Sequence, residues 1–240
     1  MIDAAPQNKN RRRRKIWAAV LFVPLFLGVT FYVWFLASWA NAARLPPLRD
    51  GDIVFNTSTS PQSLAVGLAT QSLLTHVGFI RHRDGVPYVI EASRITGEMP
   101  LTTWISEGYG GRLLVMRPET LAPAQFAAAA RFGEKHFGKP YDIFFAPGHD
   151  AFYCSELVHD AFAAGGVTLG RVQKLRDLHL TSAPVRKLIG ARWARHPRCK
   201  DGAAKDADDC LSMIGTLDIV TPVSLSRDKS LRVVYSNYLF

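Results

Sequence analysis

The hydrophobic residues of this chain fall into short runs of two kinds, separated by turns that contain Gly, Pro and polar residues. Runs rich in Val, Ile, Phe and Tyr predict β-strands at residues 52–55, 76–82, 86–92, 113–117, 218–220 and 231–235. Longer runs that start at a cap or Pro signal, or end at Gly, predict helices at residues 61–74, 123–138, 154–164 and 183–194. Because the strands cluster centrally with helices on both sides in sequence, we expect an α+β fold rather than a parallel doubly wound sheet.

Two of the predicted strands, 76–82 and 86–92, are joined by Arg83-Asp84-Gly85. Asp-Gly between two β-rich runs is a strong signal for a hairpin, since both central residues of such a turn need a positive φ. We therefore expect these two strands to lie side by side.

A different pattern occupies the start of the chain, where residues 16–40 contain no charged side chain. A helix needs about 20 apolar residues to span a bilayer, and Trp17, Trp34 and Trp39 lie near the two ends, as interfacial aromatic residues do. The arginines before this run predict a cytoplasmic N-terminus. The pattern thus predicts a basic cytoplasmic tail (1–15), a single-pass signal-anchor helix in the inner or cytoplasmic membrane (16–40), a Pro-rich linker (41–49), and a folded domain in the periplasm or exterior (50–240).

Two other interpretations of residues 16–40 stay open. Ala40-Asn41-Ala42 resembles a signal-peptidase site, although the apolar run is longer than the 7–15 residues or so that are usual in a signal peptide. A buried core helix is the second alternative, and the four consecutive arginines beside the run argue against it. The anchor and the cleaved signal peptide both export the domain.

The positive charge of the chain is concentrated at its N-terminus. Residues 1–15 hold six basic side chains and one acidic side chain, whereas the remainder holds 23 basic and 19 acidic residues. A basic tail on a nearly balanced body, without aromatic residues among the basic ones, is not typical of a nucleic-acid-binding surface. We expect no nucleic-acid partner.

Cys199 and Cys210 bracket a polar segment. In an oxidising compartment they would close this segment as a disulfide and leave Cys154 as the odd free thiol. His196 and Cys199, with Cys210, are zinc-ligand types, but they lack a clear fourth ligand and a CxxC pair. Two unrelated surface cysteines are the third alternative. We favour the disulfide and predict no metal and no cofactor.

Cys154 opens the predicted helix 154–164. The positive end of the helix macrodipole and the unpaired amides of the first turn stabilise a thiolate, which is the nucleophilic form of cysteine. A buried structural thiol is the alternative, because free cysteine is among the most buried residue types. The polar neighbours Tyr153, Ser155 and Glu156 favour the reactive interpretation.

A cysteine nucleophile is commonly activated by a neighbouring base, and His76 at the start of the 76–82 strand is one candidate. A lone histidine at such a position is more often structural. His149, in a loop close in sequence to Cys154, is the strongest competitor, and His159 lies five residues along the same helix and so well around its axis. The remaining histidines are His82, His136, His179 and His196.

Glu91 lies in the otherwise apolar strand that the hairpin pairs with the His76 strand. A buried carboxylate there needs a partner, because an unpaired buried charge is costly. Orienting the imidazole of His76 would satisfy it and complete a Cys-His-Glu relay. A strand-edge glutamate in water is the alternative.

Five short segments follow one another along the chain: GDIVF at 51–55, THVG at 75–78, IEA at 90–92, GKPYD at 138–142 and YCSELV at 153–158. Together, and in this order, they resemble the circularly permuted NlpC-type papain-like hydrolases of the YiiX/YebB-like branch. In the unpermuted enzymes the cysteine helix precedes the histidine strand, whereas here the histidine comes first. The resemblance covers roughly residues 50–240. It implies an α+β papain-like fold whose antiparallel sheet packs on helices, among them the cysteine helix.

The resemblance also implies a role for each matching residue. Cys154 is implied as the nucleophile, His76 as the general base and then acid, and Glu91 as the group that orients the imidazole. Tyr141 is implied beside the cysteine to help bind the oxyanion, with the backbone amide of Cys154 as the other donor. The apolar N-terminal run and the charged segment 199–210 depart from the family's pattern.

These observations predict a membrane-anchored, extracytoplasmic cysteine hydrolase that attacks an amide or ester carbonyl and forms a thioacyl-enzyme. A cell-wall peptide amidase or endopeptidase is the first expectation. A lipid amide or ester hydrolase, or an acyltransferase, is the alternative that the apolar segment 141–147 would favour, although ordinary core packing explains that segment more simply. A non-catalytic envelope-binding module is the interpretation from another class. The sequence predicts neither the acyl acceptor nor the oligomeric state.

Overall fold

The computed structural model of the 240-residue chain describes residue 23, residues 26–33 and residues 39–238. It divides into two compact units, Met1–Trp39 and Ala40–Phe240. In the first unit residues 26–33 are helical. The expected tail 1–15, and much of the expected span 16–40, lie outside the described residues.

The expected transmembrane helix is wrong as far as the described residues go. No helix among them is long and apolar enough to cross a membrane.

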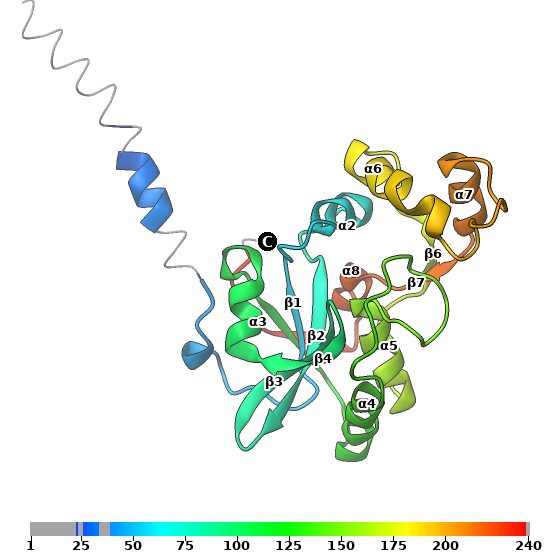
Figure 1. The fold of residues 1–240 in the computed structure, drawn as a ribbon. Helices are drawn as coiled ribbons and strands as arrows, with labels where there is room; N and C mark the ends of the chain where they lie inside the picture. Colours follow the sequence, from blue (N-terminus) through cyan, green and yellow to red (C-terminus); the bar gives the residue numbers. More distant parts are fainter. Residues whose placement is uncertain (1–22, 24–25, 34–38, 239–240) are drawn as a thin grey trace, which may run out of the picture. The chain divides into compact units, whose positions relative to one another are not determined.

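A six-stranded sheet forms the centre of the second unit, with the strand order β4-β3-β2-β1-β5-β8 (Figure 1). Each neighbouring pair in it is antiparallel, in agreement with the α+β fold expected from the sequence. The strands are β1 (Ile53–Asn56), β2 (His76–Arg83), β3 (Val86–Ala92), β4 (Thr96–Pro100), β5 (Leu114–Pro118) and β8 (Leu231–Ser236).

The hairpin between β2 and β3 fixes the register on which the site depends. Asp84 and Gly85 both have positive φ, 50° and 77°, as the Asp-Gly signal predicts. The turn pairs Arg83 with Val86 and, five residues further along the ladder, Gly78 with Glu91.

Helices cover both faces of the sheet. On one face, α4 (Pro123–Lys135) and α5 (Cys154–Ala164) pack on β2 and β3 around a core that includes Phe55, Phe79 and Phe162. On the other face lies α3 (Leu101–Glu107), whose Trp104 is buried beside Ile80 and Val89. The alternating side chains of each strand supply the two cores.

Residues 41–49, expected to be an extended linker, are part of this second core. Ala42–Arg44 form a 3-10 turn, and Leu45 and Leu48 pack against the cluster that contains Trp104. The leucines on either side of the two prolines give the segment an apolar surface to bury, which a linker prediction based on Pro content overlooked.

Residues 173–219 form a C-terminal cap beside α2 (Ser63–Thr70). Its two ends are joined by β6 (Gln173–Lys174) and β7 (Asp218–Ile219), which pair with each other rather than with the main sheet. Between them lie the 3-10 turn Leu175–Asp177, α6 (Ala183–Arg192), the 3-10 turn Trp193–Arg195 and α7 (Ala207–Ile214), followed after β7 by α8 (Pro222–Ser226). The predicted strand 218–220 is therefore a cap strand, and α7 begins at Ala207, near the end of the segment that the sequence suggested was a polar loop.

Candidate active site

Cys154 is the first residue of α5 and is 4% exposed. Tyr153 before it is extended, so the helix starts at the cysteine. Two hydrogen bonds hold this start against the segment after β7: Ser155 Oγ donates to the Val220 carbonyl (2.8 Å), and the Val220 amide donates to the Tyr153 hydroxyl (3.2 Å). The first amides of α5 are thereby held at a fixed place around the thiol.

His76 begins β2 and joins the thiol to the sheet. Its Nε2 hydrogen-bonds with Glu91 Oε2, and its ring also hydrogen-bonds with the Cys154 side chain. Because Nε2 is engaged by the carboxylate, Nδ1 is the nitrogen left to exchange a proton with sulfur. The three residues that the resemblance implied as a relay are thus brought together.

Gly78 makes room for this arrangement. Glu91 lies opposite Gly78 in the ladder, diagonal to His76 on the same face of the sheet. A Cβ on residue 78 would lie 2.7 Å from the Ile90 carbonyl oxygen and 3.3 Å from Glu91 Cβ. A residue larger than glycine at position 78 of the THVG segment would therefore clash with β3.

The electrostatics of the pair favour a charged imidazole. Burial acts to lower the pKa of His76, but the charge of Glu91 and hydrogen bonds with Cys154 and Glu91 outweigh it and raise the pKa to about 10. Burial acts to raise the pKa of Glu91, yet its interaction with His76 holds that pKa below the usual value. An imidazolium facing the sulfur stabilises a thiolate.

Trp104, which the sequence did not single out, completes the environment of Glu91. Its Nε1–H donates to Glu91 Oε2 (2.7 Å), and its ring stacks on His76 with 5.8 Å between centroids and 24° between planes. The indole therefore holds the carboxylate and shields the imidazole. It comes from α3, a short helix that no local sequence signal marked.

Tyr141 is another neighbour of the thiol. An isolated β-bridge pairs it with Phe152, two residues before the cysteine. Its hydroxyl hydrogen-bonds with the thiol and backbone of Cys154 and with the side chain of Gln62. Burial and the charge of Cys154 raise the pKa of Tyr141 well above its usual value, so its hydroxyl keeps the proton that an oxyanion donor needs.

Arg192, at the end of α6, connects the cap to this group. Its guanidinium donates to the Ile143 carbonyl (2.8 Å) and to Gln62 Oε1 (3.0 Å). A hydrogen-bonded chain thus runs from Arg192 through Gln62 to Tyr141. The sequence separation of these residues gave no pattern by which to find them.

The competing histidines have other partners. His149 Nε2 lies 3.1 Å from Asp160 Oδ2, and His159 Nδ1 lies 2.6 Å from the Leu169 carbonyl oxygen. Both contacts account for ring nitrogens without involving the thiol.

Cys199 and Cys210 are joined in a disulfide, with 5.4 Å between their Cα atoms. Their sulfurs are therefore not available as the zinc ligands that the sequence left open with His196. Both cysteines are buried, and Ala204, Ile214 and Leu217 pack around them in a small core of the cap.

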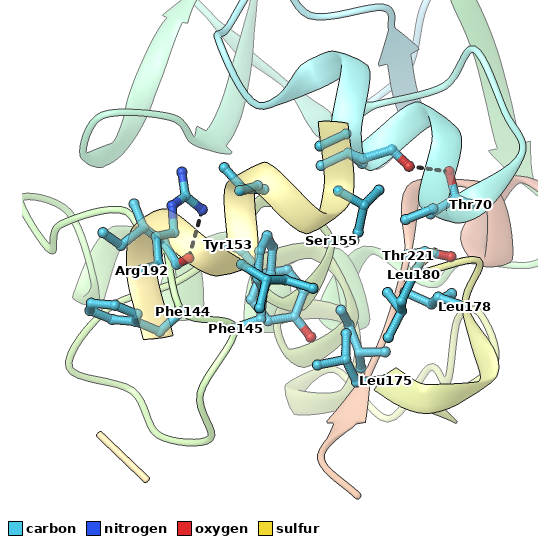
Figure 2. Close-up of a pocket in the computed structure, with 18 of the residues that line it drawn as sticks. Thr70, Phe144, Phe145, Tyr153, Ser155, Leu175, Leu178, Leu180, Arg192 and Thr221 are labelled. Carbon is cyan, nitrogen blue, oxygen red and sulfur yellow. Dashed lines mark hydrogen bonds between the residues drawn. The ribbon is translucent and has the colours of Figure 1, made fainter. Parts of the chain in front are cut away.

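An apolar pocket opens beside Cys154, between α2 and the cap (Figure 2). Its volume is about 120 Å³. Cys154 and Tyr141 belong to its wall, which continues with side chains of α2, of segment 143–145, of α6 and of segment 219–222. The apolar segment 141–147, for which core packing was the simpler explanation, thus contributes Ile143, Phe144 and Phe145 to a pocket.

The histidine-before-cysteine order and the relay agree with a match to a family model. Residues 47–235 match the model for a permuted papain-like amidase enzyme, the YaeF/YiiX or C92 family. The chain belongs to this family of permuted papain-like amidases. Membership makes it a papain-like cysteine amidase or peptidase, as the resemblance implied.

Two comparisons with relatives agree with this C92 assignment. The chain is 36% identical over 150 residues to the uncharacterised protein YiiX of Escherichia coli K12, covering 62% of this chain and 74% of that protein. It is also similar to the crystal structure of YiiX from Escherichia coli O157:H7, with 30% identity and a TM-score of 0.68 over 78% of this chain and 97% of that one.

The solved YiiX is described as a metalloprotein. Within residues 39–238 and the described N-terminal residues, no group of three or more His, Cys, Asp or Glu side chains is placed to hold a metal ion.

Proposed function

We propose that this protein is an extracytoplasmic cysteine hydrolase that cleaves amide or ester bonds through a thioacyl-enzyme on Cys154. The observation that carries the proposal is the relay: a thiol at a helix start, an imidazole against it, and a buried carboxylate on the imidazole's second nitrogen. The Cys199–Cys210 disulfide supports a location outside the cytoplasm, because such bonds persist in oxidising compartments.

We expect the reaction to take two steps, acylation of Cys154 and hydrolysis of the thioacyl-enzyme. The Cys154 sulfur bonds to the substrate carbonyl carbon, and His76 gives its Nδ1 proton to the nitrogen or oxygen that leaves. We assign the Tyr141 hydroxyl, which keeps its proton and interacts with Cys154, as the donor to the oxygen that becomes negative, with the Cys154 amide as the second donor once a substrate oxygen displaces its contact with Tyr141. A water then loses a proton to His76 and bonds to the same carbon, and the sulfur leaves as the thiolate, which restores the thiolate and the charged imidazole for the next cycle.

The substrate has two candidates. A cell-wall peptide is the one that amidase chemistry outside the cytoplasm suggests first. A lipid acyl amide or ester is the second, and the apolar pocket beside Cys154 favours it. Both candidate substrates contain an amide or ester carbonyl that the Cys154 sulfur can attack.

Trapping the intermediate tests the proposal. The full chain is incubated with envelope extract, quenched in acid, and the Cys154 peptide is weighed by mass spectrometry, with Cys154→Ala as the control. We expect an adduct on Cys154 alone, of peptide or fatty-acyl mass. A thiol that acquires no adduct, and that alkylates no faster than a free model thiol, would instead support a non-catalytic envelope-binding module.

A further inference from the structure

Gln62 is the N-cap residue of α2, but its side chain does not cap that helix. Ser, Thr, Asp and Asn usually fill this role, because their short side chains place an oxygen against the first amides. The longer Gln62 side chain turns to two other groups. Its Oε1 accepts from Arg192 (3.0 Å), and the side chain also hydrogen-bonds with the Tyr141 hydroxyl. Gln62 therefore connects the cap to the hydroxyl beside the thiol.

The bond from Arg192 fixes which way the Gln62 amide faces. A side-chain amide has one accepting oxygen and one donating nitrogen, whereas a guanidinium has donors only. Arg192 therefore occupies the oxygen and leaves Nε2 to donate to Tyr141. Burial and the charge of Cys154 raise the pKa of Tyr141, and the Gln62 bond acts against them, as a donor to the phenol oxygen does.

This donation determines where the Tyr141 proton points. The hydroxyl oxygen accepts from Gln62 and from the Cys154 backbone amide, so its single proton is directed at the Cys154 sulfur. The negative oxygen forms next to that sulfur once it bonds to the carbonyl carbon. If Gln62 turned its amide over, the amide oxygen would accept the Tyr141 proton and draw it away from the reaction.

Arg192 also holds Tyr141 through the main chain. Its Nη1 donates to the carbonyl of Ile143, two residues after Tyr141 (2.8 Å), which is the dashed bond at Arg192 in Figure 2. Asp142, between them, accepts from two amides of the following segment and fixes the backbone there. A planar guanidinium suits this double contact, because its donors can reach two acceptors at once.

We propose that Arg192 is a positioning residue for acyl transfer, which orients the Gln62 amide so that the Tyr141 proton faces the oxygen that becomes negative. The inference rests on the proposed thioacyl chemistry and adds Arg192 and Gln62 to it. Tyr141 donates a hydrogen bond and transfers no proton, so the two steps given above are unchanged. Since Arg192 lies in α6, one residue of the cap contributes to the rate of the reaction.

A double-mutant cycle tests whether Arg192 acts through Tyr141. The full chain is assayed with 4-nitrophenyl esters of a two-carbon and a twelve-carbon acyl group, and acylation of Cys154 is followed by mass spectrometry. We expect acylation to slow about 10²-fold in Tyr141→Phe, as for the loss of an oxyanion donor, and about tenfold in Arg192→Ala. The ester concentration that gives half the maximal rate should not change, because the negative oxygen exists only after the sulfur attacks.

In the Tyr141→Phe background, Arg192→Ala should slow acylation no further, because the group on which it acts is gone. Losses that multiply in the double variant would overturn the proposal and leave the thioacyl chemistry standing. An absence of acylation in the unaltered protein would overturn the proposed function, and this inference with it.

Conservative changes separate orientation from packing. Gln62→Glu keeps the size of the side chain but replaces the donating nitrogen by an accepting oxygen, so it should slow acylation more than Gln62→Ala does. Arg192→Lys keeps the charge without the double contact, and its rate should lie between those of Arg192→Ala and the unaltered protein. A Gln62→Glu variant that acylates as fast as the unaltered protein would overturn the proposal.

Arg195→Ala is the matched control, since Arg195 is exposed in the same cap and lies outside the pocket wall. Its acylation rate should equal that of the unaltered protein, and a loss equal to that of Arg192→Ala would overturn the proposal. Alkylation of Cys154 by iodoacetamide forms no negative oxygen on a carbonyl carbon. It should therefore persist in every variant, and an unchanged circular dichroism spectrum shows that each variant is folded.

Discussion

The two sides of Cys154 differ in the polarity of the side chains that surround the thiol. On the sheet side, His76, Glu91 and Trp104 form a polar group in which ring stacking and hydrogen bonds fix each member. On the cap side, the thiol meets an apolar pocket. Under the function proposed above, the sheet side would supply the chemistry and the cap side would contact the group that undergoes it.

The two sides also differ in how they are held. The sheet side is fixed by the β2–β3 register, in which a shift of one residue would turn Glu91 to the opposite face. The cap has a small core of its own, is closed by a two-residue strand pair, and carries the disulfide. Changes on the sheet side should therefore alter reactivity, and changes in the cap away from Arg192 should alter which substrates react.

His76→Ala should give the largest effect, because it removes the proton donor and the charge that faces the thiol. We expect acylation of Cys154 by a two-carbon ester to slow by about 10²–10⁴-fold, with a slower alkylation near neutral pH. His149→Ala is the matched control, since His149 pairs with Asp160 instead. Equal loss in both variants would break the assignment of His76 as the base.

Glu91→Gln should come next and should change the pH profile. Glu91 helps raise the pKa of His76 to about 10, so the imidazolium that protonates the leaving group persists until the pH rises through that value. Without the carboxylate charge the pKa falls, and the alkaline limb of kcat/KM should move to lower pH. We expect a loss of about 10²-fold at neutral pH, because the ring also loses its orienting acceptor.

Glu98→Gln serves as the control for this variant, since Glu98 pairs with Arg81 and Arg83 on the same sheet away from the thiol. Its alkaline limb should match that of the unaltered protein. An unmoved limb in Glu91→Gln would show that Glu91 does not set the charge of His76.

The sheet side was also the more predictable from sequence. Asp84-Gly85 predicted the hairpin, because such a pair favours the positive φ values that a tight turn needs. The hairpin in turn predicted that Glu91 lies near His76, because alternate residues of paired strands share one face of the sheet. Trp104 was missed although it touches both residues, since α3 follows β4 directly and its apolar positions are too few to show a period. Gln62 and Arg192 reach Tyr141 only through the folding of segments far apart in sequence.

The cap was predicted least well, for a related reason. Its disulfide was predicted from the cysteine spacing and the expected compartment. The pocket was not predicted, because the apolar residues of α2, α6 and segment 143–145 that line it cannot be told apart in sequence from residues of an ordinary core. The N-terminal prediction failed differently: hydropathy alone suggested a span, and the described residues contain no helix of the required length.

Removal of the Cys199–Cys210 disulfide tests whether a change in the cap leaves the chemistry at Cys154 intact. In Cys199→Ala/Cys210→Ala, loss of a link across 11 residues should cost the folded cap about 3 kcal/mol. We expect faster hydrogen exchange in α6 and α7, with the reaction of the two-carbon ester unaffected. Cys154→Ala, which keeps the disulfide, should exchange like the unaltered protein. Slower reaction of the two-carbon ester in the double variant would show that the disulfide also helps to hold Arg192 against Gln62.

Trp104→Phe should give the smallest effect and tests what the indole hydrogen bond to Glu91 contributes to reactivity. Phenylalanine keeps a ring against His76 but loses the indole hydrogen bond to Glu91 Oε2. A hydrogen bond to a charged group contributes about 1.5–3 kcal/mol, and because the carboxylate keeps its bond to His76 we expect the low end, about a tenfold slower acylation. The relative rates with long-chain and two-carbon esters should not change, since Trp104 is not among the residues that line the pocket. Trp39→Phe, at an exposed position, is the control. A change in chain-length preference with the rate intact would mean that the two sides of Cys154 are coupled, and the division between them would fail.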